Sequence, residues 1–117
     1  MLYDNLAVNE QGHLTVGGLD TVALAEEFGA PLYVLDEDKL RENCRTYVQA
    51  LRENMPEGSY PLFAGKALCF KGLYPVLNEE GMGADVVSPG ENYTALAGGF
   101  PAEKLYFHGN NKTDEDI

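Results

Sequence analysis

The stretch YPLFAGKALCFKGLYPVLNEEGMGADVVSPGENYTALAGGFPAEKLYF (residues 60–107) decides the fold of this chain. It contains three short runs of strand-forming residues with two helical segments between them. The strands are predicted over residues 60–65, 84–87 and 104–107. Strand, helix and strand in close succession indicate parallel strands joined by right-handed crossovers, and therefore an α/β fold.

Helix-breaking residues mark the limits of the two helical segments. The apolar residues of segment 73–77 indicate the first helix, which should end near Gly81. Ser88 and Pro89 open the second helix as N-cap and first helical residue, and the two glycines at 98–99 end it.

The residues before this stretch contain further elements. Residues 13–16 are predicted to form a short strand, and Asp20 is predicted to cap a helix over residues 21–28 that Gly29 ends. The apolar run PLYVLD, residues 31–36, has the composition of another strand.

The longest helix is predicted over residues 37–54, with Asp36 as its N-cap. Its apolar residues share one face of an amphipathic helix; they are Leu40, Cys44, Val48 and Leu51. At the other end of the chain, TDEDI (residues 113–117) has the pattern of a helix start, with Thr113 as N-cap and Asp116 three residues later. A domain does not end inside the first turn of a helix, so we expect the sequence to be part of a longer protein.

The composition excludes several classes of protein. A formal net charge of -11 argues against binding to nucleic acid or to an anionic membrane. Cys44 and Cys69 have no metal-site or disulfide-framework spacing, and no apolar run is long enough to span a membrane. The start of the chain lacks the pattern of a signal peptide, so a cytoplasmic location is expected.

Chemistry in parallel α/β folds collects at the carboxyl ends of the strands. Lys66, Ser88 and His108 have that position in the sequence, and Asp85 lies inside the second predicted strand. An amine at Lys66 that is held among apolar and cationic groups would have a lowered pKa suited to Schiff-base chemistry. The alternative is an ordinary surface lysine at the end of a strand.

The other candidates also have structural alternatives. Asp85 would orient a lysine or tune its protonation, or it is a hydrogen-bonded aspartate of the strand. Ser88 and Glu91 have the spacing of a capping box, which explains both residues without any chemistry. His108 would stack on a ring or transfer a proton, or it is a structural histidine.

Several motifs resemble those of diaminopimelate decarboxylases, within the fold-type III pyridoxal-phosphate decarboxylase family. They are GAPLYVLD (29–36), FAGKALCF (63–70), DVVSPGE (85–91), AGGFP (97–101) and HGNNK (108–112). The combination of DVVSPGE with HGNNK is the specific part of the resemblance, which covers roughly residues 29–117. One departure is Leu68, where many members of the family have Asn after the lysine motif, and it suggests a subfamily.

The resemblance implies that Lys66 holds pyridoxal 5'-phosphate through a Schiff base. Asp85 and His108 match cofactor-site positions, with Ser88 and Glu91 as second-layer positions. It further implies decarboxylation of meso-2,6-diaminopimelate to L-lysine and CO2, the last step of lysine biosynthesis, by a homodimer. The expected fold is a (β/α)8 barrel. Residues 36–117 would supply about its first three units, and residues 1–35 a lead-in that packs on a C-terminal β-domain.

Three other functions remain open at this point. A related decarboxylase would act on ornithine, arginine or carboxynorspermidine, and a lone barrel would carry pyridoxal phosphate without catalysis. An unrelated α/β binding module would give Lys66 no special role. For the decarboxylase, three units leave a barrel open, so we expect the 117-residue chain alone to be inactive.

Overall fold

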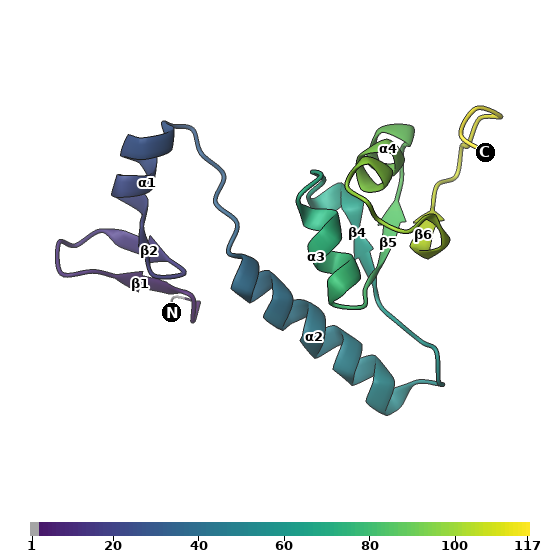
Figure 1. Ribbon diagram of the computed structural model, residues 1–117, viewed down its shortest axis with the longest axis horizontal. Coiled ribbons are helices and arrows are strands. Elements are labelled where there is room, and N and C mark those ends of the chain that lie inside the picture. The colour runs from purple at the N-terminus through teal and green to yellow at the C-terminus, as the bar shows by residue number, and fades with distance from the viewer. Residues whose placement is uncertain (1–2) are drawn as a thin grey trace. The chain divides into compact units, whose positions relative to one another are not determined.

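A computed structural model describes residues 3–117 of the chain. The chain divides into two compact units, the first ending at Glu42 and the second beginning at Asn43. Figure 1 labels their helices and strands.

The first unit contains a small antiparallel sheet and one helix. The strands β1 (Leu6–Val8), β2 (Leu14–Val16) and β3 (Leu19–Asp20) are hydrogen-bonded in that order. Helix α1 (Thr21–Phe28) follows β3 directly. The strand predicted at residues 13–16 is confirmed as β2, whereas β1 and β3 were not predicted.

A two-glycine turn explains the pairing of β2 with β3. Gly17 has φ 56° and Gly18 has φ 83°, and two successive positive φ values are typical of the tight turns that join antiparallel strands. The glycine pair therefore forms the turn between the two strands. Its position between Val16 and Leu19 was the sequence signal for a hairpin that the prediction did not use.

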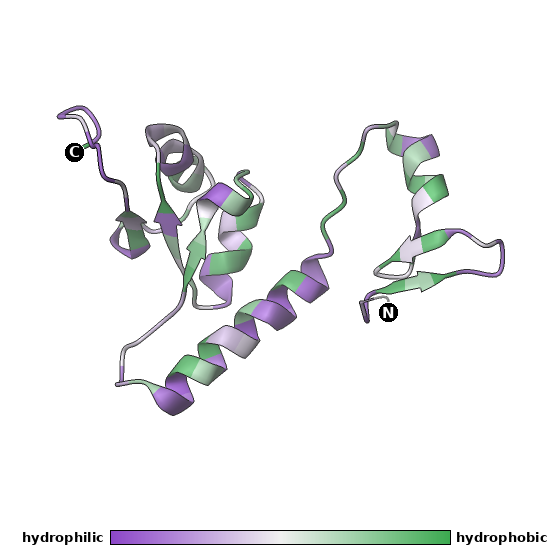
Figure 2. Cartoon of the chain, turned by 180° about the vertical axis from the view of Figure 1, so that it is seen from behind, coloured by the Kyte–Doolittle hydropathy of each residue, from purple (hydrophilic) through white to green (hydrophobic). Residues whose placement is uncertain are grey.

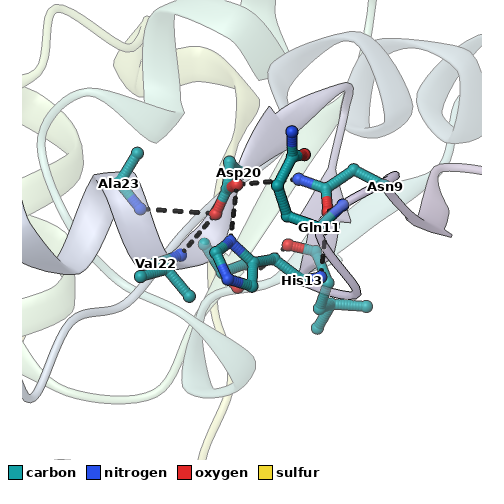
Figure 3. A network of polar contacts seen from close by, with 8 residues as sticks. Asn9, Gln11, His13, Asp20, Val22 and Ala23 are labelled. Atoms are coloured by element: carbon teal, nitrogen blue, oxygen red, sulfur yellow. Dashed lines mark hydrogen bonds and ion pairs between the residues drawn. The ribbon is translucent and has the colours of Figure 1, made fainter.

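Asp20 links the sheet to α1 through a polar network (Figure 3). Its Oδ1 accepts hydrogen bonds from the backbone N–H groups of Val22 at 2.8 Å and Ala23 at 3.3 Å, which confirms the predicted N-cap. Its Oδ2 lies 2.9 Å from Nδ1 of His13 and accepts from Nδ2 of Asn9 at 2.7 Å. The hydrogen bond with His13, followed by those from Val22, Asn9 and Ala23, lowers the pKa of Asp20 to about 2.

Helix α2 (Glu37–Asn54) has the predicted bounds. The predicted N-cap is confirmed, because Oδ1 of Asp36 accepts from the backbone N–H of Lys39 at 3.0 Å. Polar and apolar residues alternate along the helix (Figure 2), and Cys44 and Val48 of the predicted apolar face are buried. The strand predicted at residues 31–36 is wrong. The run has strand-forming residues, but no strand within residues 3–117 pairs with it, and Tyr33 is 98% exposed.

The second unit is built on the predicted parallel sheet. Strands β4 (Leu62–Ala64), β5 (Gly83–Val86) and β6 (Leu105–Phe107) are hydrogen-bonded in sequence order, with Ala64 opposite Asp85 and Asp85 opposite Tyr106. Helix α3 (Leu73–Glu79) joins β4 to β5, and helix α4 (Pro89–Ala97) joins β5 to β6. Short 3-10 helices η1 (Gly65–Ala67) and η2 (Ala102–Lys104) flank the outer strands.

The core of this unit lies on one face of the sheet. Ala84 and Val86 are fully buried, and both α3 and α4 contact β5. The buried apolar side chains of the helices and of the loops beside them are Leu73, Tyr74, Val76, Leu77, Met82, Ala95 and Phe100. Because side chains alternate along a strand, Asp85 points to the opposite face.

Several predicted segments differ in detail: β5 is Gly83–Val86 where residues 84–87 were predicted, and β6 begins one residue later than predicted, at Leu105. The strand predicted at residues 60–65 is shorter, because Gly65 already belongs to η1. Residues 113–117 form a turn instead of a helix start: the N–H of Thr113 donates to Oδ2 of Asp116 at 2.7 Å, and the N–H of Asp116 donates to the carbonyl of Thr113. One such turn has too few backbone hydrogen bonds to form a helix. Within residues 3–117, no helix combines the length and the hydropathy needed to cross a membrane.

Candidate functional site

Three sequence-predicted residues lie at the carboxyl edge of the parallel sheet. Lys66 follows β4, Ser88 follows β5 and His108 follows β6, and parallel strands bring these ends to the same edge. The backbone N–H of His108 donates to the carbonyl of Val86 at 2.9 Å, so the ladder continues one residue past β6.

Lys66 lies in the single turn of η1, directly after β4. The N–H of Leu68 closes this turn on the carbonyl of Gly65 at 3.1 Å. The lysine is exposed, and its amine has no hydrogen bond or ion pair with any residue from 3 to 117. It is therefore open to a covalent or ionic partner, although it is not enclosed by the apolar groups that sequence reasoning considered.

Two carboxylates lie near the turn that carries Lys66. Asp85 is half-buried in β5, opposite Ala64 in the register, and its side chain has no hydrogen-bond partner within the described part of the chain. Oε2 of Glu91 lies 3.1 Å from the position that a Cβ on Gly65 would occupy. Glu91 thus reaches the residue immediately before Lys66.

Ser88 and Glu91 also have the capping role that their spacing predicts. Oγ of Ser88 accepts from the N–H of Glu91 at 3.2 Å, and Oε2 of Glu91 accepts from the N–H of Val87 at 2.9 Å. Glu91 therefore reaches one residue further back than in the usual capping box. This cap fixes the Glu91 carboxylate at the edge of the sheet, so the structural role also positions a charge beside Gly65, the residue before Lys66.

His108 lies at the same edge, directly after β6. Its ring is exposed and has no hydrogen bond with any residue from 3 to 117. After it, the amine of Lys112 lies 5.7 Å from the ring centre of Phe107 and donates to the carbonyl of Gly109 at 3.1 Å. The structure therefore places Lys66, Ser88 and His108 at one edge of the sheet, and it brings the Glu91 carboxylate to Gly65, the residue before Lys66.

Sequence reasoning missed Tyr74, the second residue of α3. It is fully buried, and its hydroxyl lies 3.4 Å from Sγ of Cys69 and 3.4 Å from the Cβ position of Gly65. Burial raises the pKa of Tyr74, and the hydrogen bond with Cys69 and the charge of Glu91 raise it further. The available signal was a tyrosine within the apolar segment LYPVL, residues 73–77.

No disulfide joins the two cysteines, Cys44 and Cys69. Within residues 3–117, no three His, Cys, Asp or Glu side chains are grouped so that they could hold a metal ion.

Comparisons with known proteins give a consistent result. Residues 37–117 match the family model described as "Pyridoxal-dependent decarboxylase, pyridoxal binding domain". The chain is 44% identical to the diaminopimelate decarboxylase of Bacillus subtilis over 93% of its length, and 42% identical to that of Methanothermobacter thermautotrophicus over 99%. It covers 25% and 27% of those proteins, so the chain spans about a quarter of the curated relatives that it matches.

Solved structures agree with the sequence comparison. A crystal structure of the diaminopimelate decarboxylase from M. jannaschii in complex with L-lysine superposes with a TM-score of 0.81 at 34% identity. The match covers 97% of this chain and 26% of that one. The predicted α/β fold is thus confirmed. Because the family model covers most of the chain, this chain belongs to the pyridoxal-dependent decarboxylases, and residues 37–117 match their pyridoxal binding domain.

Proposed function

We propose that the protein containing this chain decarboxylates meso-2,6-diaminopimelate to L-lysine and CO2, with pyridoxal phosphate bound through Lys66. The position of Lys66 carries the proposal. The lysine lies in η1, which follows β4 at the carboxyl edge of the sheet, and its amine has no partner within residues 3–117. The relatives named diaminopimelate decarboxylase, at 44% and 42% identity, support this choice of substrate.

The groups at this edge fit pyridoxal phosphate chemically. An aldehyde needs a primary amine for covalent attachment, and Lys66 offers one. Carboxylates such as those of Asp85 and Glu91 stabilise positive charge on a nearby amine nitrogen. When bound, pyridoxal phosphate supplies a sink for the electron pair that the departing CO2 leaves behind.

Each remaining residue has a proposed role at its own position. Asp85 orients the amine of Lys66 from the neighbouring strand, and His108 borders the cofactor from the end of β6. Ser88 and Glu91 act together, because the cap that starts α4 also holds the Glu91 carboxylate near Gly65.

The same proposal extends to the architecture of the whole protein. Strands β4, β5 and β6 would be the first strands of a (β/α)8 barrel within residues 36–117, and residues 1–35 would be a lead-in that packs on a C-terminal β-domain. The open face of the sheet supports this view: Leu62 and Tyr106 are 42% and 48% exposed, and barrel closure would bury them. A cytoplasmic homodimer completes the proposal.

The experiment uses the full-length natural protein. It is incubated with pyridoxal phosphate, reduced with borohydride, digested and mapped by mass spectrometry, alongside Lys66→Arg and the control Lys71→Arg. Lys71 is an exposed lysine in the loop before α3. A pyridoxyl group on Lys66 is expected in the wild type and in Lys71→Arg, together with conversion of diaminopimelate to lysine, and Lys66→Arg should lose both.

Other outcomes would select a different function. Turnover of ornithine, arginine or carboxynorspermidine instead of diaminopimelate would change the substrate. Labelling of Lys66 with no decarboxylation of any of these amino acids would indicate a carrier protein. An unlabelled Lys66 in a folded protein would refute the proposal and favour the plain binding module.

A further inference from the structure

The hydroxyl of Tyr74 is buried next to the turn that carries Lys66. Tyr74 has no exposed surface, and its ring meets that of Phe100 edge to face, with centroids 5.7 Å apart. These contacts hold the ring in one place. The polar end of the side chain therefore has a fixed position in the core.

The hydroxyl lies beside η1. The hydroxyl lies 3.4 Å from Sγ of Cys69, which follows η1, and 3.4 Å from the Cβ position of Gly65, which begins η1. The Tyr74 hydroxyl thus lies close to the residues on both sides of Lys66: it contacts the Cys69 side chain, and it lies where a side chain at Gly65 would project. Gly98 makes room for it, because a Cβ on Gly98 would lie 3.2 Å from Cβ of Tyr74.

Burial raises the pKa of Tyr74, and the hydrogen bond with Cys69 and the negative charge of Glu91 raise it further. The group therefore remains a protonated hydroxyl throughout the physiological range of pH. A protonated hydroxyl can donate one hydrogen bond and accept another, so it is suited to hold the turn without adding charge beside the lysine.

We infer that Tyr74 is a positioning residue for Lys66, and that its hydroxyl supports η1 so that the amine is held at the edge of the sheet. The inference rests on the proposed function, in which Lys66 binds pyridoxal phosphate. Tyr74 itself touches neither the substrate nor the cofactor in this role; it acts through Gly65 and Cys69.

The test compares Tyr74→Phe with Tyr93→Phe in the full-length protein. Tyr93 lies on α4 and is 68% exposed, so it is a matched control that loses the same hydroxyl from a solvated position. Two quantities are measured: amide hydrogen exchange of the peptide that covers residues 63–70 in cofactor-free protein, and the dissociation constant of pyridoxal phosphate. A third variant, Cys69→Ala, removes the partner of the hydroxyl from the other side.

In Tyr74→Phe, exchange at Leu68, whose N–H closes the turn, should become faster. The dissociation constant should rise by about three- to tenfold, the range expected for the loss of one hydrogen bond. Cys69→Ala should change both quantities in the same direction, and Tyr93→Phe should change neither.

Unchanged exchange in Tyr74→Phe would overturn the inference, and so would faster exchange with an unchanged dissociation constant. Failure of the proposed function looks different. In that case wild-type Lys66 takes up no pyridoxal phosphate, while the exchange measurement still shows whether Tyr74 holds the turn.

Discussion

Gly65 precedes Lys66, and its lack of a side chain leaves room for two neighbouring groups. A Cβ on Gly65 would lie 3.1 Å from the carbonyl oxygen of Asp85 and 3.1 Å from Oε2 of Glu91. Both distances are shorter than ordinary contacts of a methyl group. The missing side chain is what allows the neighbouring strand and the Glu91 carboxylate to approach Gly65 this closely.

Gly65→Ala should therefore disturb the site as well as the fold. The methyl group must displace the Glu91 carboxylate or the backbone of β5, at a cost of about 1–3 kcal/mol in the free energy of unfolding. Urea unfolding of the full-length protein measures this cost. Gly109→Ala is the control, because no atom lies within 4 Å of its Cβ position, and an equal loss in both variants would contradict the explanation.

Asp20 makes the first unit sensitive to acid. Its pKa is lowered from 3.8 to about 2 in the folded chain, chiefly by the hydrogen bond with His13. The ionised carboxylate therefore stabilises the fold above the unfolded-state pKa, and this contribution is lost as the pH falls through the folded-state pKa.

Asp20→Asn keeps a capping side chain but removes the titration. The variant should be less stable than the wild type at pH 5, and the difference should shrink as the pH is lowered towards 2. Urea midpoints between these values of pH measure it, with the exposed Asp114→Asn as the control. A difference that does not change with pH would show that the Asp20 charge has no stabilising role.

Helix α4 begins at the candidate site, so its N-cap affects both the stability of the helix and the position of the Glu91 charge. Ser88→Ala removes the acceptor for the N–H of Glu91 and should cost about 1 kcal/mol of stability. Glu91→Gln keeps an acceptor for the N–H of Val87 but removes the charge. We expect Ser88→Thr to restore stability, since threonine also caps helices, and a full loss in Ser88→Thr would argue against capping.

Comparison of these variants separates the two roles of Glu91. If its charge supports the amine of Lys66, Glu91→Gln should weaken binding of pyridoxal phosphate while the urea midpoint stays close to that of the wild type. Titration of the full-length protein with the cofactor measures this. Equal binding by Glu91→Gln and the wild type would leave Glu91 as a cap alone.

Helices α3 and α4 approach closely at Gly98. A Cβ there would lie 2.6 Å from the carbonyl oxygen of Lys71 and 3.2 Å from Cβ of Tyr74. Gly98→Ala should force the helices apart and destabilise the protein by about 1–3 kcal/mol in urea unfolding. Gly90→Ala, in the first turn of α4, is the control, because the nearest atom to its Cβ position is Oγ of Ser88 at 3.9 Å. A similar loss there would contradict the steric explanation.

The second unit has two strands with a free edge. Within residues 43–117, β4 and β6 each pair only with β5. Leu62 and Tyr106 lie on the exposed face of the same sheet. The unit thus offers both backbone groups and apolar side chains for further pairing.

The 117-residue chain alone should therefore have no decarboxylase activity. Under the proposed function, a closed barrel must surround Lys66 before the site is complete. An assay for lysine formation from diaminopimelate, run on the isolated chain and on the full-length protein at equal concentration, measures the difference. Turnover by the isolated chain would refute this expectation.

Local chemistry made several elements predictable from the sequence. Asp20 begins α1 through an N-cap hydrogen bond, and Gly29 ends it with a φ of 85°. Both features depend only on residues close by in the sequence. The alternation of strands and helices predicted the parallel sheet, and it put Lys66, Ser88 and His108 at one edge.

Contacts between distant residues required the tertiary structure. The run at residues 31–36 has the composition of a strand, but a strand also needs a neighbour, and none pairs with it within residues 3–117. The approach of Glu91 to Gly65 depends on how α4 meets the end of β4. The contact of Tyr74 with Cys69 likewise depends on how the chain turns from η1 into α3, because packing, rather than any sequence motif, determines where a buried hydroxyl lies.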